Sequence, residues 1–156
     1  MKIPITKAEK FASKFSWCIA TALIVYTAIM WQQIPEQVPT HFGFSGQADN
    51  WGHKVFVWLL PLIYLGTLGL SLIVRKSPSL INLPFKLEGE AKEKGLELSY
   101  QMLAVVNLII GVLFSYLTYE IIHLEGKSIG SKIIPGFVLA LGAVVIFYLR
   151  KIRTLR

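Results

Sequence analysis

Between two long apolar runs, the chain carries the segment Ile34-Pro-Glu-Gln-Val-Pro-Thr-His-Phe-Gly-Phe-Ser-Gly-Gln-Ala-Asp-Asn-Trp-Gly-His-Lys54. Prolines, glycines, histidines, an aspartate and a tryptophan are concentrated here, whereas a plain connector needs only residues such as Gly, Ser and Asn. Proline fixes φ and glycine permits positive φ, so both residue types specify particular backbone conformations. The segment is therefore predicted to be a structured loop with one defined shape.

The apolar residues on either side of this loop come in long blocks. Hydrophobic residues make up 54% of the 156 residues, and the mean hydropathy is +0.56, too apolar for an ordinary soluble domain. A helix needs roughly 20 apolar residues to cross a hydrocarbon core of about 30 Å. The blocks predict an all-α membrane protein, a single domain over residues 1–156 with four transmembrane helices. The approximate spans are 15–33, 55–74, 101–122 and 133–149, with the structured external loop at 34–54 and a short second external connection at 120–132.

The basic residues predict the orientation of these helices. Thirteen of the sixteen Lys and Arg residues flank the apolar runs on one side. They are Lys2, Lys7, Lys10, Lys14, Arg75, Lys76, Lys86, Lys92, Lys94, Arg150, Lys151, Arg153 and Arg156. Because cytoplasmic flanks are enriched in Lys and Arg, both termini are predicted to be cytoplasmic and the loop 34–54 external. The net charge of +7 then indicates contact with an anionic lipid bilayer and no nucleic-acid partner, since no stacking aromatics alternate with the cations.

Local signals refine the first helix. Thr6 and Glu9 have the spacing of a capping box, so the helix is predicted to begin near Lys7 and to run into the first span. A basic start followed by an apolar run is also typical of a signal peptide, but no small-x-small cleavage site follows. The lone cysteine, Cys18, excludes an internal disulfide.

Polar and small residues within the runs predict contacts between helices. Asn107 is the clearest polar group inside the third run, and an interhelical hydrogen bond is its expected role. Pairs of small residues spaced by four predict close helix approach; they are Thr67/Ser71, Gly111/Ser115 and Gly136/Ala140. Alternating charges over Lys86–Ser99 predict a solvated helix that leads into the third span.

The loop and its flanks resemble the domain-of-unknown-function family 1648, which includes the SdpI-like immunity proteins of bacteria. The shared pattern consists of Ile34, Pro35, Pro39, Thr40, His41, Phe42, Gly46, Asp49, Trp51, Gly52 and Lys54, followed by an apolar run with Pro61. The resemblance implies a multi-pass protein of the bacterial inner or plasma membrane. In the best-known branch, the protein protects its own cell from a secreted toxic peptide and recruits a transcriptional repressor to the membrane. The longer immunity proteins have more spans than the four predicted here.

The resemblance implies recognition of a toxic peptide or envelope component at the outer face, leading to resistance or sensing. A cytoplasmic regulator is a further implied partner. The residues expected to bind the ligand or to fold the loop are Pro39, Thr40, His41, Phe42, Gly46, Asp49, Trp51, Gly52 and Lys54. Lys54 is expected to pair with Asp49 or Glu36.

Histidines and carboxylates leave a second interpretation open, a metal-dependent membrane enzyme. The candidate zinc ligands are His41, Asp49, His53, Glu120 and His123. The spacing H-x7-D-x3-H matches no established metal motif, and the chain has no nucleophile–base set, phosphate loop or HExxH sequence. The sequence therefore favours a structural role and predicts no cofactor. In that interpretation Asp49 caps a helix beginning around Trp51, and His41 bonds to a loop carbonyl.

Overall fold

The computed structural model describes residues 3–43, 46–123 and 133–156. Within these ranges the long helices are α1 (Lys7–Met30), α2 (Leu59–Lys76), α3 (Gly89–His123) and α4 (Ile133–Arg153). The strands are β1 (Gln37–Phe42) and β2 (Ala48–His53), and the short 3-10 helices η1 (Lys54–Trp58) and η2 (Pro78–Leu80) flank α2. With η1 joined to α2, each of these four described helices is long and apolar enough to cross a membrane. The predicted helical membrane fold is confirmed, and the loop 34–54 contains a two-stranded hairpin. The predicted connection 120–132 lies outside the described residues from 124 onward.

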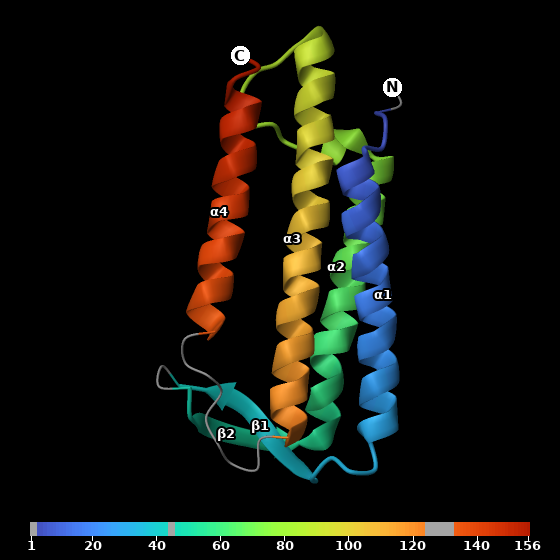
Figure 1. Ribbon diagram of the computed structural model, residues 1–156, viewed down its shortest axis with the longest axis vertical. Coiled ribbons are helices and arrows are strands. Elements are labelled where there is room, and N and C mark those ends of the chain that lie inside the picture. Colours follow the sequence, from blue (N-terminus) through green and yellow to red (C-terminus); the bar gives the residue numbers. More distant parts are fainter. Residues whose placement is uncertain (1–2, 44–45, 124–132) are drawn as a thin grey trace.

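The helices run side by side, and the hairpin covers one end of the bundle, which we call the hairpin end (Figure 1). Both chain termini lie at the opposite end, the termini end. Between the ends, Tyr64 of α2 is fully buried and its hydroxyl donates to the Ser16 carbonyl oxygen at 3.2 Å. Gly111 of α3 leaves room for the Tyr64 ring because glycine has no Cβ. A Cβ at this position would overlap the Tyr64 hydroxyl. The predicted close approach at Gly111 is therefore confirmed.

Two predictions about the helices are confirmed. Thr6 caps α1, since its hydroxyl accepts a hydrogen bond from the Glu9 backbone N–H at 3.2 Å. Asn107 of α3 donates to the Ser71 hydroxyl of α2 at 2.7 Å, the expected interhelical bond. Pro61 lies in the first turn of α2. The backbone N–H that proline lacks is needed least there, because the first N–H groups of a helix have no partner within it.

The start of α3 is more buried than its alternating charges predict. Leu96 and Tyr100 are buried, and Gly95 lies so close to Leu83 and Leu87 that a Cβ would sit 3.2 and 3.1 Å from their methyl groups. The connector between α2 and α3 thus folds back onto α3. The predicted solvated helix that leads into the third span is present from Gly89 onward, with Glu90, Lys92 and Lys94 exposed. Its apolar residues are buried beneath the connector, which the charge pattern did not predict.

The helix α4 is the least buried of the described helices. Tyr148 and Ile152 pack against Leu87 near the termini end. Gly136 and Ala140, by contrast, are exposed, and a Cβ at Gly136 would meet nothing within 4 Å. Within the described chain, the prediction that this pair contacts another helix is wrong.

Candidate functional site

The hairpin is irregular at its centre. Its strands pair antiparallel, with Pro39 opposite Trp51, His41 opposite Asn50 and Phe42 opposite Ala48. This register skips one residue in each strand, Thr40 in β1 and Asp49 in β2, so the two bulges lie on either side of the His41–Asn50 pair and compensate each other. Bulges redirect side chains and increase the local twist of a strand pair.

At these bulges, the side chains of His41 and Asp49 form a hydrogen-bonded contact across the strands. The His41 Nδ1 lies 2.5 Å from the Asp49 Oδ1. The prediction that Asp49 caps a helix and that His41 bonds to a carbonyl is wrong, because residues 48–53 are a strand and the helical segment begins only at Lys54. The cap is His53, whose Nδ1 accepts from the Val55 N–H at 3.2 Å.

Two glycines of the motif have clear conformational reasons. Gly46 has φ of +80°, in the left-handed region that favours glycine. Gly52 is packed tightly, since a Cβ there would lie 2.9 Å from the Thr40 Cγ2 and 3.0 Å from the Phe56 ring. Both positions therefore shape the hairpin.

Lys54 ties the end of the hairpin to its beginning. Its Nζ lies 2.8 Å from the Glu36 Oε1 and 5.0 Å from the centre of the Trp31 ring, and its N–H donates to the Glu36 carbonyl at 2.9 Å. Of its two predicted partners, Glu36 is the observed one. The hydrogen bond and charge of Lys54 lower the pKa of the Glu36 carboxyl, with a smaller contribution from His53, whose Nε2 lies 3.4 Å from the Glu36 Oε2.

The base of the hairpin is anchored in the bundle. Val38 is almost completely buried, in one apolar cluster with Ile34, Val57 and Ile122. In contrast, His41 and Asp49, further along the strands, are exposed. The bundle thus holds the hairpin firmly at one end and leaves its motif side chains accessible.

A cavity of about 760 Å³ lies between the hairpin, η1 and α2, α3 and the start of α4. Its hairpin wall consists of Pro39, Thr40, His41, Phe42, Asn50, Trp51 and Gly52. Its helical wall consists of Phe56, Val57, Leu59, Leu60, Leu117, Ile121 and Ile134. A cavity of this size, with mainly apolar walls and a few polar groups, is typical of sites for organic ligands.

The predicted metal ligands do not come together. His53 turns toward Glu36, and His123 stacks on Tyr119 with its Nδ1 3.3 Å from the Tyr26 hydroxyl. Among the described residues, no group of three His, Cys, Asp or Glu side chains is placed to hold a metal ion. His41, Asp49, His53, Glu120 and His123 therefore form no common centre, and the metal-enzyme interpretation is not supported.

Sequence reasoning missed the helical wall of the cavity. Leu117, Ile121 and Ile134 are apolar residues in apolar runs, so nothing distinguishes them from lipid-facing neighbours. The contact of Lys54 with Trp31 was also missed. The available signal was that Trp31 and Lys54 stand at the two ends of the loop, where a cation and an aromatic ring can meet.

Comparisons with known proteins agree with the predicted resemblance. Residues 18–65 match the model of a domain of unknown function, DUF1648, which covers the second half of α1, the hairpin and the start of α2. An uncharacterized protein of the archaeon Archaeoglobus fulgidus is 28% identical over 134 residues, covering 77% of this chain and 73% of that protein. No solved structure matches the chain. The similarity to the archaeal protein extends well beyond the DUF1648 region.

Proposed function

We propose that this DUF1648-containing, multi-pass membrane protein binds an amphipathic peptide or envelope component in the cavity at the hairpin end. Binding confers resistance or sensing, in the manner of SdpI-like immunity proteins. The proposal places the hairpin outside the cell and both termini in the cytoplasm of a bacterial cell. One observation carries it: the residues of the loop motif line a cavity.

The motif divides into two groups by position. Pro39, Thr40, His41, Phe42, Trp51 and Gly52 border the cavity. Gly46, Asp49 and Lys54 are not among its lining residues, and they set the turn, orient His41 and close the hairpin base. A plain connector needs neither group, so this division supports a binding role over a connecting one.

The chemistry of the cavity suits an amphipathic ligand. Leu117, Ile121 and Ile134 offer an apolar wall, against which burial of ligand side chains contributes about 25 cal/mol per Å². His41 and Asn50 supply polar atoms at the hairpin wall, and Trp51, 47% exposed, offers a large aromatic surface. Tryptophan often provides the strongest contact in a protein interface.

The orientation rests on charge. The basic flanks of α1, α2 and α4 all lie at the termini end, as the positions of these helix ends in Figure 1 show. Positive flanks favour the cytoplasmic side. A ligand that arrives from outside would then meet the hairpin first.

Filling the cavity tests the function. We expect Leu117→Trp to abolish protection of cells challenged with a panel of membrane-active peptides, because the indole occupies ligand space. Val112→Trp is the matched control: the same substitution on the same helix, at a position 46% exposed and outside the cavity. Membrane abundance of both variants is measured beside survival.

A direct binding measurement accompanies the survival assay. A variant that keeps Trp51 as its lone tryptophan reports on the cavity, and a protective peptide is expected to shift its emission saturably. Equal survival of the parent and the Leu117→Trp variant, at equal abundance, would contradict the proposed site.

A further inference from the structure

A charged pair is buried at the termini end, opposite the hairpin. Glu9 of α1 is only 6% exposed, and its Oε1 lies 2.8 Å from the Nε of Arg75 of α2. Arg75 also donates from Nη2 to the Ile3 carbonyl oxygen at 2.8 Å and lies 4.2 Å from the centre of the Tyr100 ring. The charge of each partner is thus compensated by the other.

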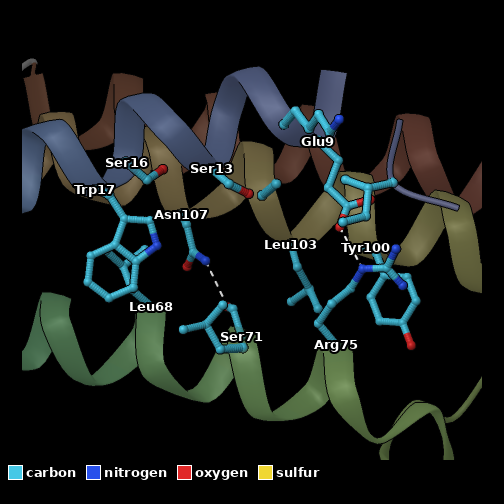
Figure 2. A pocket seen from close by; sticks show the side chains of 14 residues that line it. Glu9, Ser13, Ser16, Trp17, Leu68, Ser71, Arg75, Tyr100, Leu103 and Asn107 are labelled. Atoms are coloured by element: carbon cyan, nitrogen blue, oxygen red, sulfur yellow. Dashed lines mark hydrogen bonds and ion pairs between the residues drawn. The ribbon is translucent and has the colours of Figure 1, made fainter. Parts of the chain in front are cut away.

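Beside this pair, a cavity of about 270 Å³ opens between α1, α2 and α3 (Figure 2). Glu9, Ser13 and Ser16 project toward it from one face of α1, as their spacing of four and three residues requires. The hydrogen-bonded pair Asn107 and Ser71 borders it from α3 and α2. The cavity therefore has a polar lining inside a bundle of apolar helices.

Four polar atoms of the lining residues are buried without a hydrogen-bond partner in the described part of the chain: the Glu9 Oε2, the Ser16 Oγ, the Arg75 Nε and the Tyr100 hydroxyl. The Arg75 Nε lies in ion-pair contact with Glu9, and Ser16 is completely buried. A buried polar atom left unpaired costs about 1–3 kcal/mol, so native structures rarely tolerate one without a bound group. The lining thus includes one carboxylate acceptor and two hydroxyls without a partner.

The mouth of the cavity faces the side of α1 and α2. Among its lining residues, the exposed ones are Ile5, Lys10, Trp17 and Leu72, whereas those from α3 are buried or half-buried. Ile5, Trp17 and Leu72 make most of this mouth apolar, and Lys10 adds one cation to it. A ligand entering here would come from the lipid surrounding the helices.

We propose that this cavity binds the head of an uncharged, hydroxyl-bearing lipid of the monoacylglycerol type, with its acyl chain leaving between α1 and α2. The hydroxyl and ester oxygens of such a head donate and accept at separate positions, so different atoms of one head can meet the Glu9 Oε2 and the Ser16 Oγ, which lie about two turns apart on α1. A head buried with a charge is disfavoured because Arg75 already neutralises Glu9 inside the cavity, and the remaining cation, Lys10, is exposed at the mouth. The small volume admits a lipid head and excludes a folded peptide.

Trp17 provides the reporter for the test, since it lines the mouth. A variant with Trp31→Phe, Trp51→Phe and Trp58→Phe keeps it as the lone tryptophan. In phosphatidylcholine vesicles, a monoacylglycerol brominated on its chain is expected to quench Trp17 saturably. Unbrominated monoacylglycerol should reverse the quenching, whereas phosphatidylglycerol and free glycerol should not.

Side-chain variants connect the quenching to the cavity. Ser13→Ala combined with Ser16→Ala should weaken the apparent affinity about tenfold, as expected for lost hydrogen bonds. Thr21→Ala is the control on the same helix, because Thr21 does not line the cavity and its exposed hydroxyl donates within α1 to the Trp17 carbonyl; the affinity of this variant should match that of the parent.

Three results would overturn the proposal. The first is quenching that rises linearly with lipid and equals that by brominated phosphatidylcholine. The second is competition by phosphatidylglycerol or by free glycerol as strong as that by monoacylglycerol. The third is unchanged affinity in the double serine variant while its helical circular dichroism matches the parent.

Discussion

The two ends of the molecule use the same kind of contact in different surroundings. At the hairpin end, the side chains of His41 and Asp49 are 68% and 52% exposed, whereas at the termini end those of Glu9 and Arg75 are 8% and 19% exposed. Water screens an exposed pair, which typically contributes about 0–1 kcal/mol. Breaking a buried pair leaves an uncompensated charge in a dry site. The contact at the hairpin end therefore orients a side chain, and the one at the termini end holds helices together.

The two ends are expected to face opposite sides of the membrane. In a Cys18→Ala background, an impermeant thiol reagent on intact cells is expected to label Gln47→Cys at the hairpin end and leave Ser79→Cys unlabelled. Both native residues are exposed, so access decides the result. Permeabilised cells provide the control, because both positions should then react. Labelling of position 79 but not 47 on intact cells would reverse the orientation.

The largest loss of stability is expected at the buried pair. Arg75→Met strands the Glu9 carboxylate and should lower the free energy of unfolding by about 3–5 kcal/mol. Unfolding in mixed micelles of increasing denaturing detergent measures it. Combining Glu9→Met with Arg75→Met should recover most of the loss, because the charge is removed as well. Lys76→Met is the control at an exposed neighbour; if it destabilises as much as Arg75→Met, the pair has no special role.

A smaller loss is expected in the hairpin, where tight packing matters more than charge. Gly52→Ala forces a methyl group against Thr40 and Phe56 and should destabilise the hairpin by about 1–3 kcal/mol. Faster hydrogen exchange of the β1 and β2 amides, with unchanged exchange in α3, would show it. Gly136→Ala is the matched control, since its Cβ meets nothing within 4 Å. Hairpin exchange equal in both variants would argue against the close contact.

The contrast between the ends also explains what the sequence could predict. Long apolar runs determine membrane helices almost alone, because length and composition are the physical requirement. The hairpin gave no such signal: β1 contains Pro39, which is compatible with an edge strand, and the bulges at Thr40 and Asp49 break the alternation that marks strands.

The buried cavity at the termini end was hidden for another reason. Glu9 has a sufficient local explanation as a capping-box residue, and Arg75 has one as a cytoplasmic flank. Their contact joins distant parts of the chain and depends on how α1 packs on α2. The hydrogen bond of Asn107 was easier to predict, because a polar side chain inside an apolar run needs a partner on another helix, whichever helix that is.

The exposed pair at the hairpin end should affect activity far more than stability. His41→Ala and Asp49→Asn are each expected to lower stability by no more than about 1 kcal/mol and to reach the membrane at near-normal levels. Both should lose protection or sensing, because His41 borders the proposed ligand cavity and Asp49 orients it. Survival under a protective peptide, beside membrane abundance, is the measurement. If both variants protect like the parent, the pair is only part of the turn architecture.

The smallest expected effect concerns Glu36 and pH. Lys54 lowers the pKa of the Glu36 carboxyl below its ordinary value of 4.5. A carboxyl whose folded pKa is depressed adds stability that is fully present above the unfolded pKa and is lost as pH falls through the folded pKa. Glu36 is exposed, so water screens this contribution and it stays small. The Lys54 ammonium also lies over the Trp31 ring, which makes Trp31 a local reporter. In a variant that keeps Trp31 as its lone tryptophan, emission should change below pH 4.5, and Glu36→Gln should remove the change. If the transition persists in the Glu36→Gln variant, another group causes the pH dependence. The Lys54–Glu36 ion pair would then not explain it.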